Sequence, residues 1–128
     1  RLAKAMGLDV PAVERRYVPE PIYLIERFDR EKVGGQWRRL HAIDACQLLN
    51  LDRSYKYSQG SIETLAQLAA ACRGPAVVRT KLFQWLIFNV LIGNSDAHLN
   101  NLSFLVSASG VTLAPHYDLL ATGLYDPR

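Results

Sequence analysis

The spacing of apolar residues predicts a run of helices through the middle of the chain. Apolar residues recur at helical intervals from His41 to Leu49 and again from Ile62 to Ala69. Ser61 is a suitable N-cap for the second of these helices, and Gly74 is a suitable stop. A third helix is expected from Pro75 to about Leu91, because proline is tolerated in the first turn of a helix.

The third predicted helix is apolar on nearly all sides, which predicts that it is the buried centre of the domain. We expect the side chains of Phe83 and Trp85 to lie in the core. The other apolar residues of this helix include Val78, Leu82, Leu86 and Val90.

The first third of the chain has the composition of strands and turns. Arg1 to Met6, closed by Gly7, has the pattern of a helix end. Ile22 to Phe28 is rich in β-branched and aromatic residues, which predicts a strand. Gly34-Gly35 predicts a tight turn, and Gln36 to Leu40 a short returning strand.

A polar loop, residues 93–101, follows the long helix and leads into a predicted hairpin. Leu102 to Ser107 and Val111 to Ala114 are strand-like and flank Ala108-Ser109-Gly110. A strand, helices, a long buried helix, a polar loop and a hairpin follow one another in the order found in the large lobe of a protein-kinase-like fold. We therefore predict an α+β fold, mostly helical, as a single unit over residues 1–128.

The composition agrees with one ordinary domain. Hydrophobic residues make up 49% of the 128 residues and charged residues 21%, which is enough for a core. The net charge of +3 is modest, and Arg38-Arg39 fits solvated surface rather than a nucleic-acid footprint. Cys46 and Cys72 have no metal-type spacing, so we expect reduced core residues of a cytoplasmic protein. The longest apolar stretch, Leu82 to Ile92, is too short to cross a bilayer.

The polar loop carries the residue types that phosphoryl transfer requires. Asp96 and Asn101 have the D-x-x-x-x-N spacing of a catalytic loop, and Asp118 follows the hairpin. In such sites one aspartate accepts the proton of the attacking hydroxyl, while the asparagine and a second aspartate hold magnesium against the phosphates. Carboxylate and amide oxygens are the hard ligands that Mg²⁺ prefers. The hairpin should fold Asp118 back beside Asn101.

Other interpretations of these residues remain open. Glycine, asparagine, serine and aspartate are the usual residues of turns, so the start of the loop could be only a turn after a helix. The mirrored pairs Asp96/His98 and His116/Asp118 would also suit a metal-dependent hydrolase, although that would leave Asn101 without a role. His98 could contact phosphate, orient Asp96 or hydrogen-bond within the loop, whereas His116 fits a scaffold residue better.

Several separate motifs of the chain resemble those of the HipA family of bacterial serine/threonine kinases, the toxin halves of toxin–antitoxin pairs. The resemblance extends over nearly the whole chain. Its markers, in order, are Glu26-Arg27-Phe28-Asp29-Arg30, the helix start from Arg39-Leu40-His41 to Cys46-Gln47, Lys56-Tyr57, Phe83-Gln84-Trp85-Leu86, the Gly93 to Asn101 loop and Pro115-His116-Tyr117-Asp118.

The resemblance implies a role for each residue of the site. Asp96 would be the catalytic acceptor of the hydroxyl proton, and Asn101 and Asp118 would bind Mg²⁺. Residues 22–28 would include the hinge strand that pairs with adenine, with Asp29 near the ribose, although the residues alone also suit an ordinary sheet strand. The residues expected to bind ATP are Glu26, Arg27, Phe28, Asp29, His98, Leu99, Asn100, Asn101, Tyr117 and Asp118.

The chain also departs from the family's pattern. The glycine-rich phosphate loop and the nucleotide lysine of the family are not found before Glu26, and Lys4 and Lys32 are poorly placed substitutes. Ser58-Gln59-Gly60 stands where a carboxylate and paired glycines are common. The family's N-terminal lobe and C-terminal helices are not in the sequence. We therefore expect the chain to be a middle part of the enzyme, inactive by itself.

The resemblance implies a cytoplasmic kinase that uses MgATP to phosphorylate a serine or threonine of a protein of the translation machinery, commonly an aminoacyl-tRNA synthetase. It also implies a DNA-binding antitoxin of the HipB type as partner, with no direct nucleic-acid binding by this segment and no membrane partner. One alternative is a small-molecule phosphotransferase of the aminoglycoside-kinase or lipid-kinase type, whose loops also carry D-x-H-x-x-N. The other is a truncated kinase-like module that only binds a partner.

Overall fold

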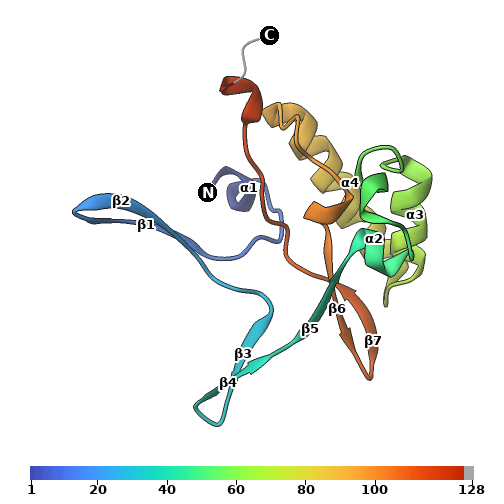
Figure 1. Cartoon of the computed structure of the whole chain (residues 1–128), viewed down its shortest axis with the longest axis horizontal. Helices are drawn as coiled ribbons and strands as arrows, with labels where there is room; N and C mark the ends of the chain where they lie inside the picture. The colour runs from blue at the N-terminus through green and yellow to red at the C-terminus, as the bar shows by residue number, and fades with distance from the viewer. Residues whose placement is uncertain (126–128) are drawn as a thin grey trace.

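Helices and three small antiparallel sheets make up the fold in the computed structural model, which describes residues 1–125 (Figure 1). The helices are α1 (Leu2–Ala5), α2 (Ala45–Leu48), α3 (Ile62–Ala70) and α4 (Pro75–Ile92), with short 3-10 turns η1 (Arg53–Lys56), η2 (Leu99–Asn101) and η3 (Thr122–Leu124). The sheets are β1 (Val13–Val18) with β2 (Glu20–Ile25), β3 (Arg30–Val33) with β4 (Gln36–Arg39), and β5 (His41–Asp44) with β6 (Ser103–Ser107) and β7 (Gly110–Leu113). The α+β class is confirmed, but the prediction of a mostly helical chain is wrong, because strands form half of the elements.

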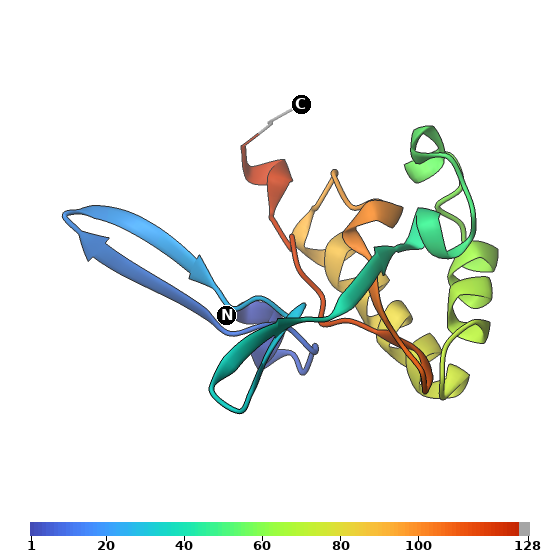
Figure 2. The same ribbon diagram turned by 60° about the horizontal axis from the view of Figure 1, so that its bottom comes forward.

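The β1–β2 hairpin projects away from the helices, and both faces of β2 are exposed (Figures 1 and 2). The strand predicted over residues 22–28 is therefore only partly right, because β2 ends at Ile25 and residues 26–28 lie outside it. Ile25 is paired with Val13, the first residue of β1. Beyond this pair one further backbone hydrogen bond joins the two segments, from the Glu26 N–H to the Ala12 carbonyl at 2.9 Å.

The predicted Gly34-Gly35 turn is confirmed. Both glycines have positive φ, +57° and +84°, which is the combination that a two-residue hairpin turn requires. The turn joins β3 to β4, whose strands pair along their full length.

The helix predicted from His41 to Leu49 is wrong in its first half. His41 to Asp44 form β5, which pairs with β6, and α2 begins only at Ala45. The carboxylate of Asp44 accepts a hydrogen bond from the Gln47 backbone N–H, and the Gln47 side chain accepts one from the Asp44 N–H. This reciprocal cap fixes the start of the helix after Asp44.

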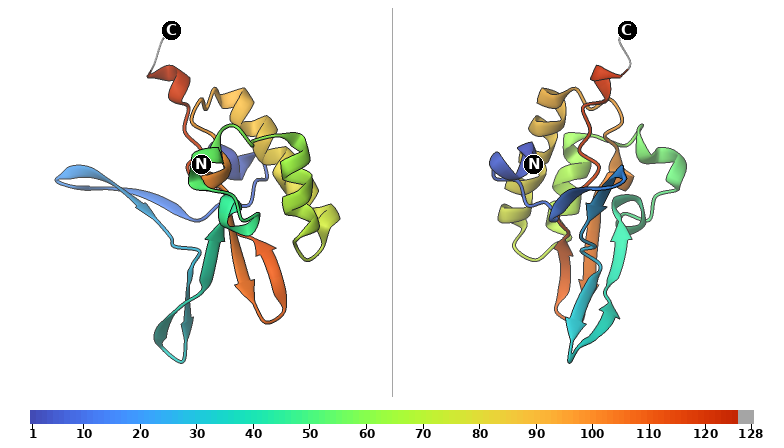
Figure 3. Two further views of the ribbon diagram at one scale, coloured as in Figure 1. Left: turned by 45° about the vertical axis from the view of Figure 1, so that its right-hand side comes forward. Right: turned by 90° about the vertical axis from the view of Figure 1, so that its left-hand side faces the viewer.

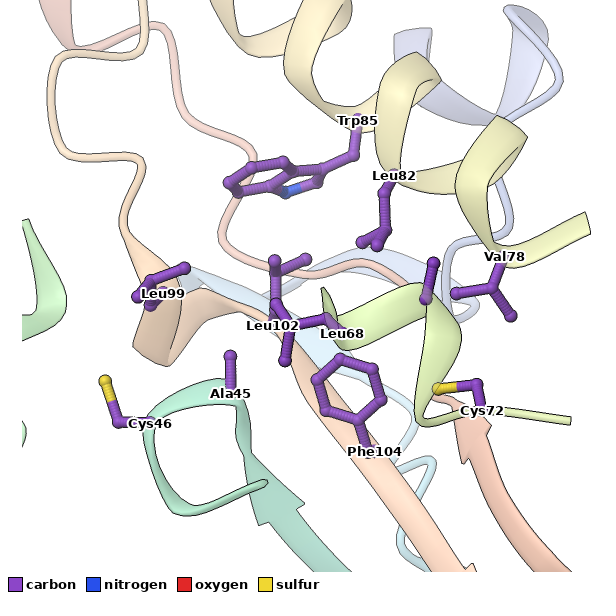
Figure 4. Packing of buried hydrophobic residues seen from close by; sticks show 11 residues of the cluster. Ala45, Cys46, Leu68, Cys72, Val78, Leu82, Trp85, Leu99, Leu102 and Phe104 are labelled. Atoms are coloured by element: carbon purple, nitrogen blue, oxygen red, sulfur yellow. The ribbon is translucent and has the colours of Figure 1, made fainter. Parts of the chain in front are cut away.

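The helices α3 and α4 pack against each other and against the three-stranded sheet (Figure 3). Ser61 caps α3 by accepting a hydrogen bond from the Thr64 N–H, as predicted. Gly74 does not end α3, which stops at Ala70; it precedes α4 in a left-handed conformation, with Pro75 in the first turn. Figure 4 shows the resulting core, in which side chains of α4 meet those in and directly after α3 and those from η2 to β6: Val78, Leu82, Trp85, Leu68, Cys72, Leu99, Leu102 and Phe104.

Only one side of α4 is buried, because α3 and the sheet cover a single face of the helix. Trp85 is 5% exposed, as predicted, but Phe83 is 62% exposed and Val90 69%, so the prediction that Phe83 lies in the core is wrong. Within residues 1–125, α4 is also the one helix that is long and apolar enough to cross a membrane by length and composition, with 28% of it buried inside the molecule.

The cysteines agree with the sequence prediction, and a second apolar cluster was not predicted. Cys46 and Cys72 are buried and unbonded to each other, and burial raises the pKa of both thiols. A second apolar cluster joins Ala3, Leu8 and Phe88, with Leu119 packed against it. This cluster attaches the segment that follows β7 to the C-terminal half of α4, and so brings Asp118 toward the end of that helix.

Candidate active site

The polar loop begins where α4 ends. Gly93 adopts a left-handed conformation with φ of 66°, and the Asn94 N–H donates to the Asn89 carbonyl at 2.9 Å. Thr122 fixes the outer side of the loop: its hydroxyl accepts from the Ser95 N–H at 2.7 Å and donates to the Gly93 carbonyl at 3.2 Å. The loop is therefore tied both to the helix and to the end of the described chain.

Two asparagine side chains connect the loop to the segment after the hairpin. Asn89, which is buried, donates to the Trp85 carbonyl at 2.8 Å and accepts from the Asn94 side chain at 2.7 Å. The Asn94 side chain also reaches the Asp118 carbonyl at 3.2 Å and accepts from the Asp96 N–H at 3.2 Å. One amide side chain therefore contacts the backbone of both aspartates of the predicted site.

The predicted metal ligands meet. The Asn101 side-chain nitrogen donates to a carboxylate oxygen of Asp118 at 2.6 Å, and Asn101 is buried while Asp118 faces solvent. The Asn101 oxygen accepts a weaker hydrogen bond from the His98 N–H at 3.3 Å. The β6–β7 hairpin produces this contact, as predicted, because it reverses the chain between the two residues.

Asp118 has a left-handed backbone, with φ of +57°. A residue other than glycine seldom adopts this conformation, although aspartate tolerates it better than most, and such residues concentrate at functional sites. The hydrogen bonds from Asn94 and Asn101 hold Asp118 in place.

Tyr117 joins three separate parts of the chain. Its hydroxyl donates to the Asn100 carbonyl at 2.9 Å and shares a hydrogen bond with Ser103 at 2.8 Å. Its ring stacks on Phe28 with a centroid distance of 5.6 Å. Burial raises the pKa of the Tyr117 phenol. Phe28 is thus brought to the site, and a cavity of about 630 Å³ opens beside Tyr117 and Asp118.

Asp96 lies on the exposed outer part of the loop, where residues 56 and 57 approach it. The Tyr57 hydroxyl donates to Asp96 Oδ1 at 2.7 Å, and the Tyr57 ring meets the His98 ring edge-on at 5.0 Å. The Lys56 ammonium lies 3.4 Å from His98 Nε2. His98 Nδ1 is buried and has no hydrogen-bond partner within residues 1–125. A partner for this atom is expected from a bound molecule or from water.

Other residues predicted to bind the nucleotide are occupied elsewhere. The Asp29 carboxylate is buried between Arg27 and Arg30, and the hydrogen bonds from Arg27 lower the pKa of Asp29 to about 2. Glu26 is exposed at the end of β2. The Leu99 side chain lies in the core, and the Asn100 side chain donates to Asp44 at 2.8 Å. Any contact of Leu99 or Asn100 with a nucleotide would therefore be made by the backbone.

The donor set suits magnesium carried by phosphates better than a metal held by protein alone. Across residues 1–125, no three histidine, cysteine, aspartate or glutamate side chains come together to hold a metal. His116 is buried, and its environment lowers its pKa to about 4 mainly through burial. The hydrolase interpretation thus lacks a ligand cluster in this region. Mg²⁺ commonly takes only one or two protein oxygens beside phosphate and water, which Asn101 and Asp118 can provide.

Three residues that organise the site were given no role in it from the sequence, although Tyr57 and Asn94 lie within motifs of the family resemblance. Asn89 is a polar residue within an apolar helix. Because a buried amide needs hydrogen-bond partners, this position could have indicated a polar contact. Asn94 looked like an ordinary turn residue. Tyr57 contacts Asp96 from 39 positions away, and no local pattern predicts a contact at that separation.

Comparisons with known proteins agree with the motifs. A family model described as the HipA-like C-terminal domain matches residues 1–128. The serine/threonine-protein kinase toxin HipA of Shewanella oneidensis is 36% identical over 143 residues, covering 98% of this chain and 33% of that protein. Y4mE of Sinorhizobium fredii, which carries the word kinase in its name, is 40% identical, covering 98% of this chain and 31% of its own length.

The fold matches a solved structure as well. A chain in the structure of the Shewanella oneidensis MR-1 toxin–antitoxin system, HipA and HipB with operator DNA, superimposes with a TM-score of 0.89 at 34% identity. The match covers 98% of this chain and 33% of that chain. The chain belongs to the HipA-like C-terminal domain family, and it spans about a third of the length of the relatives described above.

Proposed function

We propose that the chain is the catalytic segment of a HipA-like serine/threonine kinase that transfers the γ-phosphate of ATP to a protein hydroxyl. The observation that carries the proposal is the contact of Asn101 with Asp118, which lies beside the loop that bears Asp96. Asn94 gives the proposal further support, because its side chain hydrogen-bonds both the backbone of Asp96 and the backbone of Asp118. The family membership supports kinase chemistry for the full-length protein.

In the proposed reaction the acceptor hydroxyl oxygen attacks the γ-phosphorus of ATP. The new oxygen–phosphorus bond forms as the bond to the β–γ bridging oxygen breaks, and ADP leaves with that electron pair. Asp96 accepts the hydroxyl proton on its carboxylate and later releases it to water. The loop holds the Asp96 carboxylate at a fixed position, because Asn94 and Thr122 hydrogen-bond the loop backbone. The carboxylate is therefore in place when the acceptor hydroxyl binds.

Asn101 and Asp118 would hold magnesium, which neutralises phosphate charge during transfer when it is bound. Asp118 is open to solvent. The Asn101 amide would have to turn to bind magnesium, because its nitrogen faces Asp118 and its oxygen accepts from the His98 N–H. His98 Nδ1 is buried and has no hydrogen-bond partner within residues 1–125, so it would need the loop to open slightly before it could contact the phosphates. The stacked pair Phe28 and Tyr117 would border the nucleotide.

We further propose that the full-length protein acts in the cytoplasm and has a HipB-type antitoxin as partner. The support is the solved Shewanella complex, which contains HipA, HipB and operator DNA. An acceptor protein of the translation machinery, such as an aminoacyl-tRNA synthetase, remains the proposed substrate by resemblance.

The proposal is tested by incubating the full-length protein with γ-labelled MgATP and a cell lysate of its own organism, followed by phosphoamino-acid analysis. Label in phosphoserine or phosphothreonine of a protein is expected. Label found only in small molecules would support the aminoglycoside-kinase or lipid-kinase type instead. Absence of any transfer and of MgATP binding would support a non-catalytic module.

A further inference from the structure

Tyr57 makes an unexpected contact with Asp96. Its hydroxyl donates to Asp96 Oδ1 at 2.7 Å, a short hydrogen bond between residues 39 positions apart. In the part of the chain that the structure describes, the Asp96 carboxylate receives no other side-chain hydrogen bond. Its second oxygen, Oδ2, is left for another partner.

The Tyr57 ring is itself held in place against the catalytic loop. It contacts the His98 ring edge-on, with centroids 5.0 Å apart and planes at 83°. The Lys56 ammonium lies 4.8 Å from the centre of the Tyr57 ring and 3.4 Å from His98 Nε2. Lys56 and Tyr57 therefore meet the loop at both Asp96 and His98. A cavity of about 270 Å³ is lined by Lys56, Tyr57 and His98 among others.

Local hydrogen bonds hold the segment that carries Tyr57. The Asp52 carboxylate accepts from the Ser54 N–H at 2.8 Å and caps η1. The Tyr55 N–H donates to the Asp52 carbonyl at 3.0 Å, and the Gly60 N–H to the Tyr57 carbonyl at 3.1 Å. A turn that is fixed at both ends can present a side chain at a defined point over the loop.

We propose that Tyr57 is a positioning residue for Asp96: its hydroxyl holds Oδ1, so that Oδ2 faces the acceptor hydroxyl. The inference rests on the proposed kinase function, in which Asp96 accepts the proton. A carboxylate on an exposed loop can rotate, and a single donor on one oxygen limits it to the orientation useful for proton transfer. A phenol is protonated at neutral pH and can therefore donate, and the hydrogen bond to Asp96 raises the pKa of the Tyr57 phenol further.

The first test uses the full-length protein with labelled MgATP as the only substrate, so that water is the acceptor. Tyr57→Phe retains the ring against His98 and removes only the hydroxyl. We expect kcat for phosphate release to fall about tenfold or more while KM for MgATP stays within about twofold. Tyr55→Phe is the matched control, because Tyr55 lies in the same turn and its hydroxyl makes no hydrogen bond within residues 1–125. An unchanged or faster Tyr57→Phe enzyme would overturn the inference.

The second test asks whether Tyr57 acts through Asp96. In an Asp96→Asn background, Tyr57→Phe should cause little further loss of rate, since two residues of one unit are not additive. A spectroscopic measurement does not depend on enzyme activity. The titration of the Tyr57 phenol is obtained by subtracting the ultraviolet titration curve of the Tyr57→Phe variant from that of the protein with Tyr57. This difference curve should move to lower pH when Asp96 is replaced by Asn. An unmoved Tyr57 titration would overturn the inference.

The Asp96→Asn and Tyr57→Phe variants distinguish failure of the proposed function from failure of the proposed role of Tyr57. If Asp96→Asn keeps the wild-type rate, the proposed function fails and the inference fails with it. If Asp96→Asn is inactive while Tyr57→Phe is fully active, the kinase proposal stands and only the role of Tyr57 is lost.

Discussion

Asn101 and Asp118 are 17 positions apart, yet the Asn101 side chain donates to the Asp118 carboxylate at 2.6 Å. The β6–β7 hairpin brings them together, since Phe104 pairs with Leu113 and Ser107 with Gly110. The pair lies where a loop, a hairpin and the segment after it converge.

The Asn101 and Asp118 pair should set the affinity for magnesium-bound nucleotide. In the full-length protein, Asp118→Ala should lower phosphate transfer at least about 100-fold, because the loss removes a charge that binds magnesium in the transition state. Transfer measured across a magnesium titration checks this. Glu20→Ala is the control, because Glu20 is an exposed acid on β2, far along the chain from the loop. An Asp118→Ala enzyme with the wild-type magnesium dependence would contradict the metal assignment.

Asn89 should matter for stability as well as for the loop. Its side chain is buried and bonds both the Trp85 carbonyl and Asn94. Asn89→Ala removes both of these hydrogen bonds and leaves the Asn94 amide only its weaker bond to the Asp118 carbonyl, so we expect a loss of about 1–3 kcal/mol in the free energy of unfolding. Urea denaturation checks this. Gln84→Ala, on the exposed side of the same helix, should change stability by less than about 0.5 kcal/mol. An equal loss in both variants would contradict the role of Asn89.

His116 should make stability fall in acid. Burial lowers its pKa to about 4, with Asp9 raising and Lys81 lowering it, against about 6.5 in the unfolded chain. The folded state therefore binds the proton less well than the unfolded state, so stability is complete above about pH 6.5 and is lost as pH falls toward 4.

The loss attributable to His116 is about 2 kcal/mol between pH 7.5 and pH 4.5. The measurement is the change in unfolding free energy over that interval in wild type and in His116→Gln, which should lose less. His41→Gln, at an exposed position, should behave like wild type. A His116→Gln protein with the full wild-type pH dependence would rule out this origin.

The sequence predicted local features well and long-range features poorly. The Gly34-Gly35 turn, the Ser61 cap and the β6–β7 hairpin follow from residues a few positions apart, and all three are present. His41 to Asp44 became a strand because pairing with β6 outweighed the helical spacing.

Burial and distant contacts were harder to predict. Phe83 shares its helix with Trp85, and periodicity alone could not tell which face α3 and the sheet would cover. The meeting of Asn101 with Asp118 could be predicted, because a hairpin separates them. The contact of Tyr57 with Asp96 could not, because it depends on where a separate turn lies relative to the loop.

Asp96→Asn in the full-length protein is the most direct test of the catalytic role of the loop. This change keeps the size of the side chain and removes the group that accepts the proton. Transfer of the labelled γ-phosphate should fall at least about 100-fold, within the range that a positioned base contributes, while the affinity for MgATP stays within about twofold. Transfer by Asp96→Asn within about threefold of the wild-type rate would contradict the assignment of this loop as the catalytic site.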